Sequence, residues 1–305
     1  MEVGMPFENN PLSDSAHITS NTSLNPTINA WQIYLDDQAY SPHTIKAFAA
    51  DMRLVASYLP PDKTLGDIST SDLNNFLDWM QTGRGVPCSP KTLARRITSI
   101  KAFFRWLHEN GVLLTDPSEK VAQISVISPL PTVLTAEEIE LVMDTADSYR
   151  LSARPDARYS ALFSLLINTG IKKGECLALS PNHIDLMAST GPLLFVRYAS
   201  PQYRYKERKI PLPESWLEIY AEYREQYPLD DRLFPWSPRR LEYLLEDLSD
   251  ETGLEKHISF DMCRWSCALK DWQSGMEPDK IRQKLGVSKI QWREIRMKLE
   301  RLASA

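Results

Sequence analysis

The chain has 305 residues, of which 43% are hydrophobic and 25% are charged. This length predicts two domains of ordinary size, and the composition excludes collagen-like chains, disulfide scaffolds and mostly disordered proteins. The net charge of -5 excludes a protein that coats nucleic acid through bulk charge, so any DNA binding must come from a local basic patch.

Residues 1–24 mix Asn, Ser, Thr and Pro without periodicity, which predicts a flexible N-terminal arm. From residue 25 to residue 120, apolar residues recur at helical spacing in four stretches. Helices are predicted over 27–35, 42–55, 69–80 and 90–107, and serine or proline precedes or opens the last three. Residues 25–120 are therefore predicted to form a compact all-helical domain.

Residues 121–133 are predicted to be an extended linker, because Pro129 and Pro131 flank Leu130. The sequence Thr-Ala-Glu-Glu at 135–138 is a capping box and begins a second predicted domain, residues 134–305. In this domain 159–168 is a strongly apolar helix, 193–198 and 209–212 are strands, and the chain after Pro238 is helical in pattern. We expect a mostly helical domain with a small antiparallel β-sheet.

No run of about 18 apolar residues occurs, and the first residues lack the features of a secretory signal, so we expect a cytoplasmic protein with no membrane partner. The four cysteines are too few and too scattered for a disulfide framework. Cys263 and Cys267 are one helical turn apart, but no further ligands stand near them. We expect two small buried residues there and no metal site.

Several segments resemble, in the same order, those of the tyrosine recombinase or phage integrase family. In the first domain these are Tyr-Ser-Pro-His-Thr-Ile-Lys-Ala-Phe at 40–48, Ser-Pro-Lys-Thr-Leu-Ala-Arg-Arg-Ile at 89–97 and Ser-Ile-Lys-Ala-Phe-Phe-Arg-Trp-Leu at 99–107. In the second domain they are Asn-Thr-Gly-Ile-Lys-Lys-Gly-Glu-Cys-Leu-Ala-Leu at 168–179, Lys-Glu-Arg-Lys-Ile-Pro-Leu at 206–212 and Leu-Gly at 285–286. The resemblance implies a SAM-like helical core-binding domain followed by a mostly helical catalytic-type domain with a small antiparallel sheet.

The family breaks one DNA strand at a time by attack of a tyrosine on phosphorus. The resemblance therefore implies double-stranded DNA as the partner, a nucleoid-associated location, and neither a metal nor another cofactor. In the family, two arginines and usually histidines hold the phosphate oxygens, and a lysine protonates the leaving oxygen.

By this resemblance, only one of the six catalytic positions carries the family's residue, and that is Arg264. The first arginine position falls on Lys172, which keeps the charge but loses the planar fork, and Glu175 could orient it. The lysine position falls on Tyr203. Lys206 could replace it only if the hairpin register differs from the family's.

The two histidine positions fall on Asp261, whose charge repels a phosphate, and on Val287, which cannot donate a hydrogen bond. The tyrosine position, nine residues past Val287, falls on Arg296, and no tyrosine occurs after Tyr243. We therefore expect a degenerate site, a pseudoenzyme that cannot form the phosphotyrosyl bond. An accessory subunit, a regulator of recombination sites and a decayed mobile-element product all fit this expectation.

A run of basic residues predicts where the first domain contacts DNA. Residues 91–105 contain five basic side chains and no acidic one: Lys91, Arg95, Arg96, Lys101 and Arg105. In the family the corresponding helix rests against the duplex, so phosphate contacts are expected here. Lys46 and Arg53 on the preceding helix can extend this patch, and Arg204 is a candidate in the second domain.

Our first hypothesis is a DNA-binding protein of this family that clamps duplex between its two domains and takes part in recombination or integration without cutting DNA alone. The first alternative is an active recombinase subunit that uses the tyrosine of a partner in a mixed assembly. Besides DNA, the expected partners are further copies of this chain or an active recombinase, as an oligomer on DNA. A weaker alternative is Ser288 as nucleophile, although no base stands near it in the sequence. The last is a non-DNA interaction protein that reuses the fold.

Overall fold

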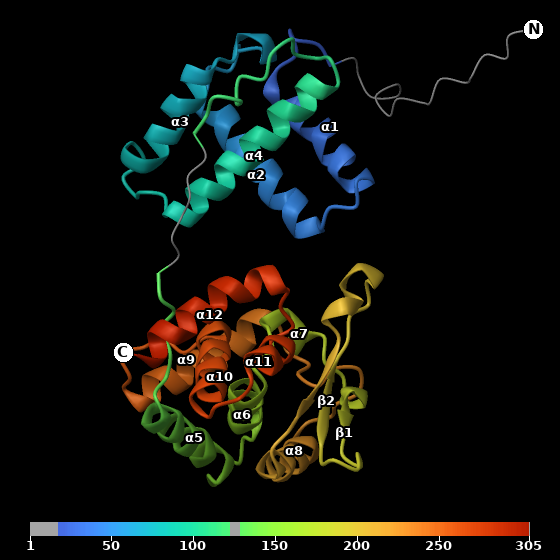
Figure 1. Ribbon diagram of the computed structural model, residues 1–305, viewed down its shortest axis with the longest axis vertical. Coiled ribbons are helices and arrows are strands. Elements are labelled where there is room, and N and C mark those ends of the chain that lie inside the picture. Colours follow the sequence, from blue (N-terminus) through green and yellow to red (C-terminus); the bar gives the residue numbers. More distant parts are fainter. Residues whose placement is uncertain (1–17, 123–128, 305) are drawn as a thin grey trace, which may run out of the picture. The chain divides into compact units, whose positions relative to one another are not determined.

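The computed structural model describes residues 18–122 and 129–304. The chain divides into two compact units, residues 1–128 and residues 129–305, and each has its own hydrophobic core (Figure 1). Residues 1–17 of the predicted arm and 123–128 of the predicted linker lie outside the described residues.

The first unit consists of helices α1 (Leu24–Asp37), α2 (Pro42–Tyr58), α3 (Thr70–Thr82) and α4 (Pro90–Glu109), with a 3₁₀ turn, η1 (Leu65–Asp67), before α3. The side chains of Ser41, Ser69 and Ser89 cap the starts of α2, α3 and α4 by accepting a backbone N–H. Proline at the first position of α2 and α4 presets the helical φ. The four predicted helices are confirmed.

Large aromatic side chains fill the core of the first unit. Trp31 of α1 lies edge-to-face on Phe103 of α4 with ring centroids 5.2 Å apart, and Phe48 of α2 stacks on Trp31 at 5.8 Å. Burial of rings of this size is the main source of stability in a helical bundle. Helix α4 is held by its apolar stripe, so its opposite face is free to carry basic side chains.

The ends of the predicted arm and linker belong to the folded units. The backbone N–H groups of Leu65 and Gly66 donate to the carbonyls of Thr22 and Ser20 at 2.9 and 2.8 Å, and α1 begins at the buried Leu24. Val121 is buried in the core of the first unit. The sequence did not reveal these contacts because they join segments about 40 residues apart, where local composition carries no signal.

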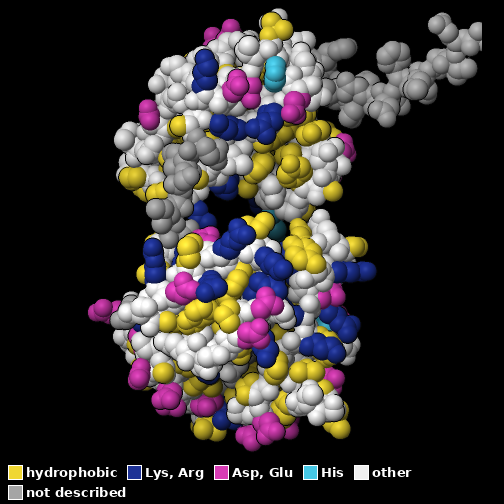
Figure 2. Space-filling model, viewed as in Figure 1, with side chains coloured by type: hydrophobic (Ala, Val, Ile, Leu, Met, Phe, Trp, Pro, Cys, Tyr) yellow, Lys and Arg dark blue, Asp and Glu magenta, His cyan; other side chains and the backbone are white. Residues whose placement is uncertain are grey.

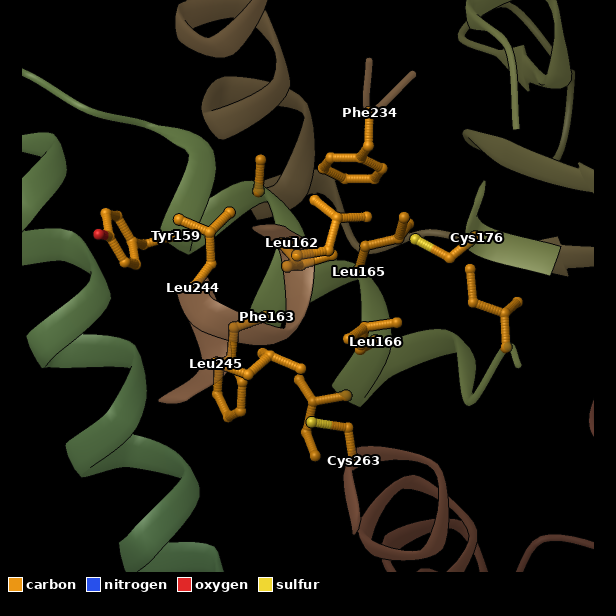
Figure 3. Close-up of a cluster of buried hydrophobic side chains, with 14 of the residues drawn as sticks. Tyr159, Leu162, Phe163, Leu165, Leu166, Cys176, Phe234, Leu244, Leu245 and Cys263 are labelled. Atoms are coloured by element: carbon orange, nitrogen blue, oxygen red, sulfur yellow. The ribbon is translucent and has the colours of Figure 1, made fainter. Parts of the chain in front are cut away.

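Helix α6 (Arg158–Thr169) is the centre of the second unit. Ten of its 12 residues are buried, on all sides of the helix, and a helix of this kind is stable only when other elements surround it. Figure 3 shows its side chains leaving the helix in several directions toward residues of other segments. The neighbours labelled there include Cys176, Phe234, Leu244, Leu245 and Cys263. Gly170, with φ +59°, ends α6 in a left-handed turn.

The elements around α6 are mostly helical. They are α5 (Ala136–Arg150), α7 (Lys173–Leu177), α8 (Glu214–Gln226), α9 (Pro238–Thr252), α10 (Phe260–Gln273), α11 (Pro278–Lys284) and α12 (Lys289–Ala303), with 3₁₀ turns η2 (Pro181–His183) and η3 (Pro201–Lys206). A second apolar cluster joins α10, α11 and α12 through Ala268, Leu269, Ile281, Leu285 and Leu299.

The sheet has three antiparallel strands in the order β1-β2-β3. Strand β2 (Leu193–Val196) pairs with β3 (Arg208–Pro211), with Leu194 opposite Ile210, and β1 (Ile184–Asp185) flanks β2. The sequence predicted β2 and β3 but not β1, which is two residues long and too short to show an alternating pattern. The predicted fold class, mainly helical with a small antiparallel sheet, is confirmed.

No helix among the described residues is both long enough and apolar enough to span a bilayer. All four cysteines are free, and Cys263 and Cys267 are buried in α10. Within residues 18–122 and 129–304, no group of three or more His, Cys, Asp or Glu residues is placed to hold a metal ion.

Candidate functional site

The buried carboxylate of Glu175 organises the predicted site of the second unit. It lies in the first turn of α7, and its side chain is 2% exposed. The Lys172 backbone N–H donates to its Oε2 at 2.8 Å, Arg208 donates to both oxygens at 3.0 and 2.8 Å, and the Tyr198 hydroxyl donates to Oε1. Burial alone would raise the pKa of Glu175, but these donors and the Arg208 charge hold its pKa at about 2.

Arg208 of β3 connects three separate parts of the site. Besides its two bonds to Glu175, it donates from Nε to the Lys284 carbonyl at 2.6 Å and from Nη1 to the Lys206 carbonyl at 3.1 Å. Its side chain is 7% exposed, and its charge is matched by that of Glu175. Sequence patterns did not single out Arg208, because only the fold brings β3 beside α7 and α11.

Arg264 of α10 is half-buried, and its hydrogen-bond partners are neutral carbonyls. Its Nη1 donates to the Gly170 carbonyl, and its Nη2 donates to the Leu285 carbonyl at 2.6 Å. In the part of the chain that the structure describes, no carboxylate lies within ion-pair distance of this guanidinium. Burial lowers the pKa of Arg264, yet arginine stays protonated, so the site keeps this positive charge.

Lys172 adds a second cation to the same place. It immediately precedes α7, it is half-buried, and burial together with the charge of Arg264 lowers the pKa of its ammonium. Lys172 and Arg264 both line a cavity of about 530 Å³. No ion pair of the Lys172 ammonium is found within residues 18–122 and 129–304. Two of the predicted site residues thus meet in one pocket.

The same cavity contains acidic groups and a histidine. Asp261, at a predicted histidine position, lines it from the exposed start of α10, and Glu246 lines it from α9. Lys173 and Arg239 also line it, but both pair with Glu242. His257 is exposed and lies at this cavity, and it was missed in the sequence because it lies four residues before Asp261, outside the aligned position.

The remaining family positions lie away from this cavity. Val287 packs in the apolar cluster of α10, α11 and α12. Arg296 lies on the exposed side of α12, where its Nε donates to Glu300 at 2.8 Å. The side chain at the predicted nucleophile position is therefore not among those that line the cavity with Lys172 and Arg264.

Residues of the hairpin line a second and larger cavity of about 770 Å³ between β3 and α11. Its charged lining residues are six basic ones, Lys206, Arg208, Lys209, Lys280, Arg282 and Lys284, and one acidic one, Glu207. Lys206 lies over the ring of Tyr203 at 4.5 Å, and Lys209 lies over the ring of Phe195 at 5.0 Å. Arg204 is exposed on η3. The basic residues of α11 were not predicted, because their role depends on their position opposite β3.

The predicted basic patch on α4 contains two kinds of side chain. Arg95 and Arg96 both pair with the buried carboxylate of Asp51, which also accepts the Ser99 hydroxyl at 2.7 Å. Arg96 is 14% exposed and donates to the Cys88 sulfur at 3.1 Å, so it acts inside the unit. Arg95 is 42% exposed and keeps part of its surface at the patch.

Most of the other cations of the patch are open to solvent. Lys46, Lys91 and Arg105 are exposed, and Lys101 is half-buried near the Glu119 carbonyl. Arg53 donates to the amide oxygens of Asn29 and Gln32, which leave its charge uncompensated. These side chains and the outer part of Arg95 give the first unit a positive surface that suits a polyanion.

Figure 2 shows Lys and Arg side chains, with some Asp and Glu side chains among them, over the part of the second unit that carries α11, while Asp and Glu side chains gather over α5 and α8. The acidic residues of these two helices are numerous: Glu137, Glu138, Glu140, Asp144, Asp147, Glu214, Glu218, Glu222 and Glu225. The negative net charge of the chain is therefore compatible with basic surfaces elsewhere on the molecule.

Comparison with known proteins gives matches over both units. The N-terminal SAM-like domain of phage integrases matches residues 28–111, and the phage integrase family matches residues 132–295. A protein named tyrosine recombinase XerD from Listeria innocua serovar 6a is 25% identical over 273 residues, which cover 85% of this chain and 89% of the relative.

Two solved structures have a similar fold. A lambda integrase dimer bound to a COC' core site matches with a TM-score of 0.71 and 16% identity, over 95% of this chain and 81% of the other. The XerH site-specific recombinase bound to a palindromic difH substrate, in a post-cleavage complex, matches with a TM-score of 0.70 and 20% identity, over 94% and 90%. At these identities the match shows a shared fold.

Proposed function

The chain belongs to the phage integrase family of tyrosine recombinases, and from this premise we propose that it binds duplex DNA in recombination or integration without cutting the DNA alone. The observation that carries the proposal is the pair of cations Lys172 and Arg264. They line one cavity, and in the described residues neither has a carboxylate partner. A phosphodiester would supply the negative charge and the hydrogen-bond acceptors that both side chains lack in this cavity.

Basic surfaces on both units support DNA as the ligand. In the first unit these are the exposed cations around α4. In the second they are Lys206 and Lys209 at the cavity between β3 and α11, which have no ion pair among the described residues, whereas the other four basic lining residues pair with acidic ones. The two solved neighbours are described as DNA complexes, one of them as a dimer. These descriptions support DNA binding by this chain, and assembly on DNA, as parts of the proposal.

The lack of cleavage follows from the positions that a nucleophile and its helpers occupy in the family. No tyrosine follows Tyr243, Arg296 is exposed and paired with Glu300, and Val287 offers no donor. Lys172 and Arg264 can hold a phosphate and stabilise its charge, but they cannot form the covalent intermediate.

A second candidate is a subunit of a mixed assembly that receives the tyrosine of a partner. Ile290 and Met297 of α12 are 79% and 58% exposed, and residues seven apart share one face of a helix. An exposed apolar face suits contact with a neighbouring subunit. Ile290→Glu with Met297→Glu should then reduce assembly on DNA, measured by sedimentation, without weakening the binding of a single copy.

The first experiment measures DNA affinity by fluorescence anisotropy over a series of salt concentrations, using a duplex selected from a random pool. Lys172→Met removes one of the two cavity cations, and Arg296→Gln is the control because this exposed side chain lies away from the cavity. If Lys172 contacts a phosphate, the slope of log affinity against log salt falls by about 0.9 in Lys172→Met. Arg296→Gln should leave the slope unchanged.

Nicked duplexes that trap a covalent adduct test the second half of the proposal. We expect salt-sensitive binding and no adduct that survives denaturation. An adduct would show that the chain uses another nucleophile, and equal slopes for wild type and Lys172→Met would remove the cavity from the DNA interface. Absence of any binding at low salt would favour a protein partner.

A further inference from the structure

Two arginines join the same two segments of the second unit. Arg264 donates to the carbonyls of Gly170 and Leu285, and Arg208 donates to Glu175 and to the carbonyl of Lys284. Both therefore connect residues 170–175 with residues 284–285. Such paired bonds across a site fix the positions of the groups between them.

The two arginines differ in what happens to their charge. Arg208 forms a two-bond ion pair with Glu175, whereas the partners of Arg264 are neutral carbonyls. In Glu175, Oε1 accepts from Tyr198 and Arg208, and Oε2 accepts from the Lys172 backbone and Arg208. Both oxygens have two donors, so no acceptor capacity is left for the Lys172 ammonium.

We propose that Arg208 is a positioning residue that occupies the Glu175 carboxylate and thereby keeps the Lys172 ammonium and the Arg264 guanidinium available for a phosphodiester. This inference rests on the proposed function, since it assumes that the anion is DNA. Arg208 itself is only 7% exposed and has four of its five N–H groups in bonds to the protein, so its effect on DNA passes through Glu175.

Removal of Arg208 shows what this arrangement prevents. In Arg208→Met the buried carboxylate of Glu175 loses its ion pair and has empty acceptor sites, which is costly in a buried setting. Lys172 lies three residues before Glu175, and its four-carbon stem can turn toward the carboxylate. Lys173 is one residue nearer, but it already pairs with Glu242. The ammonium would then be neutralised inside the protein and lost to the phosphate.

The test compares Arg208→Met, Glu175→Gln and the double variant with wild type, first without DNA. Competitive labelling of amines followed by mass spectrometry gives the pKa of Lys172 alone. The charged groups that act on it are Arg264, Glu175, Lys206 and Arg208. Its pKa should rise in Arg208→Met, where Glu175 is unmatched. It should fall in Glu175→Gln, where Arg208 is unmatched, and lie near wild type in the double variant.

DNA affinity provides the second readout. Arg208→Met should lose about tenfold in affinity, the loss that about 1.4 kcal/mol produces, and the double variant should regain most of it. A purely structural role predicts the opposite, because the double variant lacks the same bonds and would bind as poorly as Arg208→Met. Circular dichroism and thermal melting identify the variants that are folded.

Each result has a defined meaning. Equal losses in Arg208→Met and the double variant, or a Lys172 pKa that does not move, overturn the inference. If Arg208→Met does not fold, the test rests on the Lys172 pKa in Glu175→Gln. An unchanged Lys172 pKa in that variant also overturns the inference. If the pKa moves as expected but wild type binds no DNA, the proposed function fails while the charge arrangement stands.

Discussion

Gly286 lies directly against the guanidinium of Arg208. It has φ +59°, and a Cβ at this position would stand 2.5 Å from Arg208 Nη1. Any other residue would thus combine a left-handed backbone with displacement of a buried ion pair. The Leu-Gly dipeptide that marked the family resemblance at 285–286 therefore has a local physical cause in this chain.

We expect Gly286→Ala to lower the free energy of unfolding by about 3 kcal/mol, since it disturbs the Arg208–Glu175 pair. Gly253→Ala is the matched control, because Gly253 has φ +66° and nothing lies within 4 Å of the place that a Cβ would take. The control should lose only the backbone cost of about 1–2 kcal/mol. Urea unfolding of both variants measures the difference, and equal losses would contradict the contact with Arg208.

Glu175 gives the stability a defined dependence on pH. Its pKa is about 2 in the folded chain against 4.5 for a free glutamate, so its contribution is complete above about 4.5 and is lost as the pH falls through about 2. The shift corresponds to about 3 kcal/mol. Wild type should therefore lose about this much stability relative to Glu175→Gln between pH 6 and pH 2. Unfolding of both proteins across this range measures it, and a constant difference would contradict the prediction.

At the level of single residues, the sequence predicted part of the candidate site. Lys172, Asp261 and Arg264 were identified from their places in aligned segments, and they do line one cavity. Arg208 and His257 were not identified. Their importance depends on which strand or loop the fold places beside α7 and α10, and local sequence does not contain that information.

Helix α4 shows why a run of basic residues does not equal a run of DNA contacts. Five basic side chains were predicted to form one patch, but α4 has a buried side as well as an exposed one. Arg96 is turned to Asp51 and Cys88, and Arg95 is shared between Asp51 and the surface. Periodicity predicts only the face of the helix on which a residue lies. Which arginines turn away from the surface depends on the buried Asp51 of α2, with which Arg95 and Arg96 pair.

This difference between neighbouring positions on one helix can be measured. Lys91→Met should reduce the salt dependence of DNA affinity by about 0.9 in slope and leave stability within about 0.5 kcal/mol of wild type. Arg96→Met should lower the free energy of unfolding by about 1–3 kcal/mol, because the buried Asp51 loses one of its two ion-pair partners, and keep the slope. Salt titrations and urea unfolding test both, and the reverse pattern would place Arg96 in the DNA interface.

For the whole molecule, the sequence predicted the class of fold better than the details of its surface. The apolar helix at 159–168 and the strands around 193 and 209 were visible because buried elements carry continuous apolar patterns. The cavity between β3 and α11 was not, since its basic residues come from segments about 70 residues apart. A net charge of -5 describes the sum of an acidic region over α5 and α8 and of these basic surfaces, and DNA responds to the local field.

Removing cations from each unit separately and then from both together tests whether both units contact the same DNA. Lys46→Met with Lys91→Met removes exposed cations of the first unit, and Lys206→Met with Lys209→Met removes cations of the second that have no ion pair in residues 129–304. If both units bind one duplex, each pair should reduce the salt slope by about 1.8 and all four changes together by about 3.6.

The free-energy losses should also add, since the two sets belong to separate compact units and share no partner. Arg154→Gln with Arg224→Gln removes the same charge from exposed positions, Arg224 being on the acidic helix α8, and should change neither slope nor affinity. If only one unit binds, only one pair has an effect and the combined variant equals it. If both pairs of changes have an effect, the chain holds the duplex with two weak surfaces at once. Because the two units are joined in one chain, binding of one unit raises the effective concentration of the other at the DNA.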